Sequence, residues 1–236
     1  MPTTSECFNR ILEQYLPARN TQQFAQNPIR EQFTSVCHNL EDLAAVRLNP
    51  QLSVEWSAGK GNWAKVPWIA FLDHRETNTT QFGVYGVFLF CQDMTGVYLT
   101  LAQGVTRLIK DMGRTKAQET LRDRATSIAV ACTPLLSRGF KTDANIDLKA
   151  DAGLGADYQS STIAYKFFPA ETFQDESCIA SFNEDIESLL HVYRGFIENK
   201  QNVNEITHLH HLFEIHSKFD GDCCEGRCES GWVLPV

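Results

Sequence analysis

The sequence lacks the features that would place the protein in a membrane or send it out of the cell. None of its apolar runs approaches the roughly 18 residues that a membrane span needs. Its first residues, MPTTSECFNRILEQYLPAR, have neither the basic start nor the apolar run of a signal peptide. We therefore expect a cytoplasmic protein with no membrane partner, whose eight cysteines are reduced rather than paired in disulfides.

The sequence also lacks the motifs of the common nucleotide-binding and hydrolytic enzymes. The Gly59-Lys60 pair does not form a phosphate-binding loop, because Lys60 is followed by Gly61 and not by Ser or Thr. There is no glycine-rich dinucleotide fingerprint after a strand and no Gly-x-Ser-x-Gly elbow. We therefore expect no intrinsic catalytic activity.

Positive charge is scarce and unevenly placed. The chain has 21 Lys and Arg against 29 Asp and Glu, a net charge of −8, which argues against a protein that coats nucleic acid through a broad basic surface. Between residues 107 and 124, however, basic residues outnumber acids, so a local basic surface is expected there. Its members are Arg107, Lys110, Arg114, Lys116, Arg122 and Arg124.

Residues at both ends of the first 200 positions have the spacing of amphipathic helices. The first helix is expected to begin at a Ser5 cap and to stop at Pro17, and the second to begin at an Asn27 cap and to run to about residue 46. A further helical segment is predicted from about 105 to 136, broken near Gly113. The last is predicted over residues 181–200.

Between residues 52 and 104 the chain contains four short β-branched and aromatic segments, LSVEWSA, VPWIAFL, GVYGVFLFC and GVYLTLAQG. The turn DMTG, with Gly96 available for a positive φ, predicts an antiparallel hairpin, and STIAYKFFPA predicts one more strand. The fold class is therefore α+β, a central antiparallel sheet flanked by N-terminal and C-terminal helices. We expect one domain over residues 1–200 and a His- and Cys-rich appendage over 201–236.

The appendage contains residues that bind zinc in other proteins. His208 and His211 share a face if the segment is helical, and Cys223 and Cys228 supply thiolates nearby. The spacing matches no standard zinc finger, so the alternative is a solvated helix end followed by reduced thiols. Zinc at this place is the one cofactor that the sequence suggests.

A cluster of acidic residues upstream suggests different chemistry. Asp147 to Lys149, with Asp143 upstream, resembles the acid-and-lysine pattern of some metal-dependent nucleases. Such triplets are common by chance. The alternative function is therefore a small metal-dependent nuclease that uses residues 143–149, or a zinc-binding protein that uses the His and Cys tail.

The stretch WSAGKGNWAKVPWIAFLD combines large aromatics, a cation and flexible backbone at the start of a strand. Trp68 is expected at the mouth of this strand, beside a glycine-bracketed loop that carries Lys60. Flat aromatic surface, close backbone approach and a nearby cation suit a stacked nucleobase with its phosphate. The alternative is that these tryptophans simply pack in the core.

The same stretch, followed by GVYGVFLFCQDMTGVYLTLAQG, resembles the N-terminal domain of the McrB subunit of modification-dependent (type IV) restriction systems. The resemblance implies binding of double-stranded DNA that carries a modified cytosine, with the base flipped into an aromatic pocket. Trp68 and Leu89 match pocket residues, and Tyr158 matches a further wall. Lys60 stands where the characterised member has a tyrosine, which places a cation in or beside the pocket.

The resemblance also implies what the chain needs from a partner, and the local density of basic residues indicates which residues contact the DNA backbone. The motor that hydrolyses GTP in this family has no counterpart in the sequence, so a nuclease or NTPase partner subunit is expected to supply any cleavage. The expected backbone contacts come from the glycine loop and the basic segment: Gly59, Gly61, Asn62, Lys65, Arg107, Lys110, Arg114 and Lys116.

Overall fold

The computed structural model describes residues 2–25 and 27–221, with side chains described as far as residue 203 apart from residue 176. The chain divides into two compact units, Met1–Phe196 and Ile197–Val236. The elements are α1 (Thr4–Thr21), α2 (Ile29–Glu41), α3 (Ala44–Arg47), β1 (Leu52–Lys60), β2 (Asn62–Asp73), β3 (Val84–Phe90), β4 (Gly96–Gln103), α4 (Thr106–Met112), α5 (Arg114–Ala129), η1 (Val130–Cys132), α6 (Thr133–Leu136), α7 (Ala152–Ser161), β5 (Thr162–Pro169), η2 (Ala170–Gln174), η3 (Glu176–Cys178) and α8 (Ile179–Gly221).

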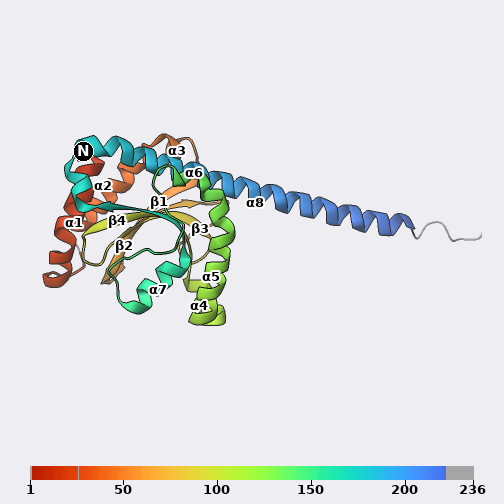
Figure 1. The fold of residues 1–236 in the computed structure, drawn as a ribbon, viewed down its shortest axis with the longest axis horizontal. Coiled ribbons are helices and arrows are strands. Elements are labelled where there is room, and N and C mark those ends of the chain that lie inside the picture. The colour runs from red at the N-terminus through yellow and green to blue at the C-terminus, as the bar shows by residue number, and fades with distance from the viewer. Residues whose placement is uncertain (1, 26, 222–236) are drawn as a thin grey trace, which may run out of the picture. The chain divides into compact units, whose positions relative to one another are not determined.

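The five strands form one antiparallel sheet in the order β1-β2-β3-β4-β5. Figure 1 shows the sheet in the middle of the domain, with helices around it. Its register places Trp68 opposite Leu89 and Leu89 opposite Tyr98, so these three side chains share one face. The predicted α+β class with a central antiparallel sheet is confirmed, and the helical segment after residue 105 breaks at Gly113, as its sequence predicts.

One face of the sheet is covered by α1, α2 and the part of α8 that ends at Phe196, and we call it the phenylalanine face. Phe88 lies at its centre, with its ring centroid 5.2 Å from that of Phe8 and 5.6 Å from that of Phe182. Leu189 packs over Gly86, where an added Cβ would lie 3.0 Å from a leucine methyl. This close packing leaves Phe8, Phe88 and Phe182 at most 1% exposed.

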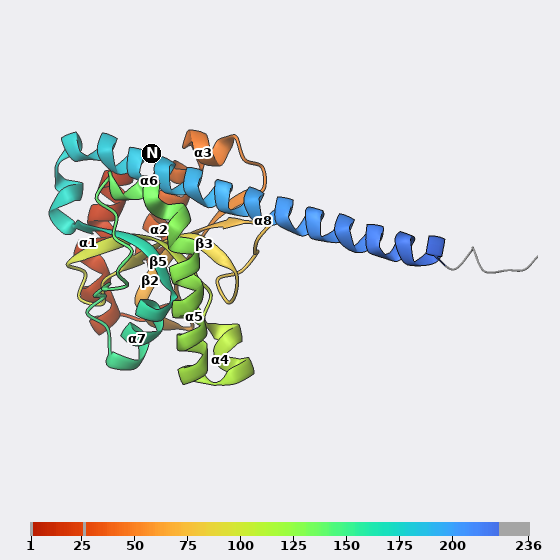
Figure 2. The same cartoon turned by 45° about the vertical axis from the view of Figure 1, so that its right-hand side comes forward.

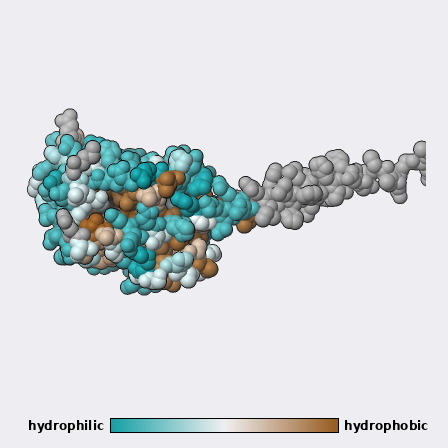
Figure 3. Space-filling view, turned by 90° about the horizontal axis from the view of Figure 1, so that it is seen from above, coloured by the Kyte–Doolittle hydropathy of each residue, from teal (hydrophilic) through white to brown (hydrophobic). Residues whose placement is uncertain are grey.

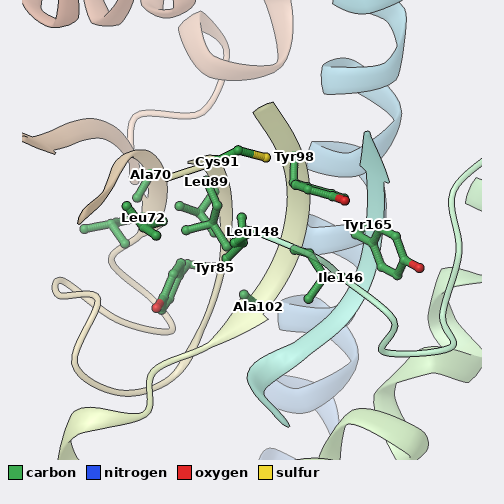
Figure 4. Close-up of a cluster of buried hydrophobic side chains, with 12 residues drawn as sticks. Ala70, Leu72, Tyr85, Leu89, Cys91, Tyr98, Ala102, Ile146, Leu148 and Tyr165 are labelled. Carbon is green, nitrogen blue, oxygen red and sulfur yellow. The ribbon is translucent and has the colours of Figure 1, made fainter. Parts of the chain in front are cut away.

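The opposite face, which we call the tyrosine face, carries Tyr85, Tyr98 and Tyr165 (Figure 4). An irregular segment packs Ile146 and Leu148 against part of this face. Figure 2 shows α5 and α7 in front of the sheet, with α1 and α2 behind it. Helices thus cover the two faces unequally, because on the tyrosine face part of the cover is irregular chain.

The first helix differs from its prediction at both ends. Thr3, not Ser5, is the N-cap, and it forms a capping box with Glu6. The Ser5 hydroxyl instead donates a hydrogen bond of 2.6 Å to the Phe173 carbonyl. Pro17 lies inside the helix, which continues to Thr21, so the expected stop at this proline is wrong. Packing of the buried apolar stripe outweighs the one hydrogen bond that proline cannot donate.

The glycine loop is the turn of a β1–β2 hairpin, because β2 begins at Asn62, before the predicted strand. Gly59 is required by this geometry: its φ is 126°, and an added Cβ would lie 1.9 Å from the Asn62 carbonyl oxygen. The hairpin is held to α1 by Trp63, whose indole N–H donates to the Gln22 carbonyl at 3.0 Å.

Three further predictions needed correction. The second helix ends at Glu41, and α3 follows as a separate turn. In the DMTG turn the positive φ, 61°, is at Met94 and not at Gly96, since Asp93 accepts bonds from Thr95 and fixes the turn. Helix α7, which lies between residues predicted as loop and strand, was not predicted.

Few large apolar side chains are exposed on the residues that the structure describes. The view in Figure 3 is mostly hydrophilic, with small separated hydrophobic patches. No helix within the described ranges has the length and apolar character needed to cross a membrane. The large apolar side chains that are exposed are few and scattered: Leu48, Val130, Leu136, Phe167 and Val203.

Candidate nucleic-acid interface

A cavity of about 380 Å³ opens on the tyrosine face between the sheet, α7 and the α4–α5 turn. Strands β2, β3 and β4 supply its floor, since alternate residues of each strand point to this face. Helix α7 supplies one wall, and α4 with the first residue of α5 supplies another. The lining residues are Trp68, Thr80, Tyr85, Val87, Leu89, Ala102, Gln103, Val105, Thr106, Ile109, Arg114, Leu154, Asp157, Tyr158 and Ser161.

Three aromatic side chains line this cavity: Trp68 on β2, Tyr85 on β3 and Tyr158 on α7. Trp68 and Tyr158 form its walls, and their rings make no contact with each other. Neither the indole N–H of Trp68 nor the hydroxyl of Tyr158 has a hydrogen-bond partner within the described chain. Burial, with a smaller contribution from the charge of Asp157, raises the pKa of Tyr158 to about 12. The Tyr158 hydroxyl is therefore protonated at neutral pH and can donate to a ligand.

The polar side of the cavity is built around Asp157, which is 6% exposed. Gln118 donates from Nε2 to its Oδ1 at 2.9 Å, and Nη2 of Arg114 lies 3.4 Å from its Oδ2. Tyr85 is held by a different contact, a 3.0 Å hydrogen bond from its hydroxyl to the Thr80 carbonyl. The cavity thus combines an apolar floor, two aromatic walls and one buried carboxylate.

Basic side chains are present on α4 and α5, the two helices that line one side of the cavity. Arg114 lines it directly, with its side chain 58% exposed. Arg107, Lys110 and Lys116 are exposed on the same two helices. The Arg107 guanidinium lies 5.3 Å from the centre of the Phe82 ring, which orients one of these charges. A cavity rim of this kind suits an anionic ligand backbone.

The structure brings together some of the residues predicted for the site and separates others. Trp68, Leu89, Tyr158 and Arg114 line one cavity. Lys60 does not line it, because it lies in the hairpin turn, three residues beyond the strand partner of Trp68. The expected place of Lys60 in the base pocket therefore finds no support in the cavity lining.

The remaining predicted backbone residues lie outside the cavity lining. Gly59 and Asn62 lie in the paired ends of β1 and β2, and Gly61 connects the two strands. Lys65 makes an ion pair with Asp151, the residue that precedes α7. This pair connects the start of β2 to the wall that carries Tyr158. DNA contact by these four residues remains a prediction.

The acidic cluster of residues 143–149 is occupied by local contacts. Asp143 accepts a 2.6 Å hydrogen bond from the Tyr165 hydroxyl, and Asp147 forms an ion pair with Lys149. The side chains described here include no group of three His, Cys, Asp or Glu residues placed to hold a metal ion. The nuclease alternative therefore gains no geometric support.

The predicted zinc ligands fall where the structure gives no side-chain description. His208 and His211 lie within α8, but their side chains are not described. Cys223 and Cys228 lie outside the described residues. Zinc binding remains a prediction from the sequence.

Sequence reasoning missed two important lining residues, Tyr85 and Asp157. Tyr85 follows from the strand pattern, because it alternates with Val87 and Leu89 on one face of β3. Asp157 had no usable signal, since α7 was not predicted and the position next to Tyr158 had no assigned structure.

The structure is thus an α+β domain with an antiparallel sheet, helices on both of its faces and an aromatic-walled cavity on the tyrosine face. The family model of the MrcB-like N-terminal domain matches residues 10–198. The chain therefore belongs to this family. Neither a curated protein nor a solved structure matches it.

Proposed function

We propose that this domain recognises double-stranded DNA carrying a modified cytosine, as the DNA-binding part of a cytoplasmic restriction-type defence system. The modified base leaves the duplex and enters the cavity, where it stacks between Trp68 and Tyr158 above Leu89. Membership in the MrcB-like family supports the class of domain. The base and its extrusion are proposals made from the site.

One observation carries this proposal: a cavity lined by aromatics adjoins the basic segment of the chain. Trp68 and Tyr158 were predicted for a base pocket, and Arg114 was predicted for the DNA backbone. These predictions rest on separate features of the sequence, yet all three residues line one cavity. A base held there would leave its flanking phosphates near α4 and α5, where Lys110 and Lys116 are exposed.

The cavity is suited to a base in size and surface. Its volume of about 380 Å³ falls in the range of about 300–1,000 Å³ typical of small-ligand sites. Extruding a base costs a few kcal/mol. Stacking on an aromatic side chain contributes about 1–3 kcal/mol per base. Two aromatic walls and the polar groups of the cavity can together offset the cost.

Cleavage is assigned to a partner subunit, a nuclease or an NTPase, because Asp143 and Asp147 already have local partners. The purified chain should leave supercoiled DNA intact in the presence of magnesium. Cleavage that disappears in Asp147→Asn would instead support the nuclease alternative.

The direct test is binding to one duplex with a single cytosine that is plain, methylated, hydroxymethylated or glucosylated. Trp68→Ala should reduce the preference for a modified base by about ten- to a hundredfold. Trp56→Ala is the matched control, because Trp56 is also half-buried but stacks on Phe33 on the phenylalanine face. A fluorescent base analogue beside the modified position should report extrusion. Equal affinity for all four duplexes would contradict the proposal for these ligands.

A further inference from the structure

Asp157 and Asp185 each have two partners, fewer than the buried Asp73, and Asp157 is the one of these acids that lines the cavity. An ionised carboxylate offers about four lone-pair sites. Asp73, at the end of β2, accepts four hydrogen bonds, one from Asn49 and three from Arg75. Asp157 has only two partners in the described chain, Gln118 and Arg114.

The two partners of Asp157 come from one element, α5, while Asp157 also lines the cavity. Each partner contacts a different oxygen, so both oxygens keep an acceptor site. It is the only acidic side chain in the cavity lining, and its neighbour in sequence, Tyr158, forms an aromatic wall. The Asp157 carboxylate is therefore fixed in place by α5 and still has acceptor sites that a ligand in the cavity can use.

We infer that Asp157 selects the extruded base by its exocyclic amino group, accepting a hydrogen bond from N4 of a cytosine and rejecting uracil and thymine. This inference rests on the proposed function. A carboxylate accepting from the cytosine amino group is a favourable pairing in DNA recognition. Uracil and thymine present a carbonyl oxygen at the same position, so two acceptors would face each other without a proton between them.

The test compares bases that share the substituent at position 5 and differ at position 4, where one has an amino group and the other a carbonyl oxygen. The carbonyl member of each pair also carries a proton on N3. One matched pair is 5-methylcytosine and thymine, and a second is 5-hydroxymethylcytosine and 5-hydroxymethyluracil. Each base is placed opposite an abasic site, because extrusion then requires no base pair to be broken. The unaltered protein should bind the amino member of each pair about ten- to a hundredfold more tightly.

Asp157→Asn should reduce this ratio to a few-fold or less, because an amide offers both a donor and an acceptor. Asp151→Asn is the control, since Asp151 is an exposed acid just before α7 that does not line the cavity. It should leave the ratio unchanged. A purely structural role for Asp157 would weaken both members of each pair equally, and that result would overturn the inference.

The outcomes separate this inference from the function on which it rests. If the unaltered protein binds both members alike, yet prefers modified DNA in a Trp68-dependent manner, the Asp157 inference is wrong and the proposed function stands. If neither modification nor Trp68→Ala changes binding, both fail. The comparison of the amino and carbonyl bases needs only the unaltered protein. Equal affinity for the two members of each pair would therefore contradict the Asp157 inference even if Asp157→Asn does not fold.

Discussion

The two faces of the central sheet use the same strands for different purposes. On the phenylalanine face, Phe88 packs between rings from α1 and α8 and is fully buried. On the tyrosine face, its neighbour Leu89 lines the cavity. Phenyl rings carry no polar atoms and can close a core completely, whereas tyrosine hydroxyls need partners and suit a surface that also binds. Alternation along β3 thus separates the residues that fill the closed core from those that line the cavity.

The largest effect is expected from a substitution that disrupts packing on the phenylalanine face. Phe88→Ala should lower the free energy of unfolding by about 3–5 kcal/mol, because a fully buried ring leaves a cavity in a close-packed core. Urea denaturation measures it as a shift in midpoint at constant slope. Trp68→Ala should cost less stability although tryptophan is larger, since Trp68 is only half-buried. An equal loss in the two variants would contradict the division between the faces.

The strand pattern made the sheet predictable, including the residues that share a face. Alternation in VPWIAFLD and GVYGVFLFC places Trp68 and Leu89 on the cavity side, and the structure has them there. The helix break at Gly113 could also be predicted, because glycine adopts positive φ angles that end a helix. In the structure its φ is 80°. Strand alternation and helix-breaking glycines depend on the local sequence, so these parts of the fold can be predicted from it.

The rest of the site depends on tertiary contacts that a sequence does not display. Helix α7 contains Gly153 and Gly155 and has weak helical propensity. Contacts made by Asp157 with Gln118 and Arg114 connect it to α5. Lys60, which the family resemblance placed in or beside the pocket, does not line the cavity, and its contact with a base stays a prediction.

The second prediction concerns buried acids whose acceptor sites are filled. Burial alone would raise the pKa of Asp73, but hydrogen bonds from Arg75 and Asn49 hold it below its ordinary value of 3.8. Its stabilising contribution is therefore present above pH 3.8 and is lost as the pH falls from there through the folded-state pKa. Asp73→Asn should cost about 1–3 kcal/mol at pH 7.

Unfolding measured from pH 7 down to pH 3 checks this prediction. The difference between Asp73→Asn and the unaltered protein should shrink once the pH is below 3.8. Asp157→Asn, which removes fewer internal contacts, should destabilise less at pH 7. A pH-independent difference for Asp73→Asn would show that its charge does not contribute.

The smallest expected effect compares exposed charges beside the cavity with exposed charges on other elements. Lys110 and Lys116 lie on α4 and α5, the two helices that line one side of the cavity, whereas Arg10 on α1 and Arg47 on α3 lie on elements that do not line it. Each phosphate contact that is lost should lower the slope of log affinity against log salt by about 0.9. The double variant Lys110→Ala, Lys116→Ala should therefore reduce this slope by about two units. The reduction should be equal for plain and modified duplexes, because phosphate contacts carry no base information.

The control is the double variant Arg10→Ala, Arg47→Ala, which removes the same charge and should leave the slope unchanged. Titrations at four salt concentrations distinguish the pairs. Equal slopes for the two double variants would mean that the effect follows net charge and that the DNA does not lie across α4 and α5.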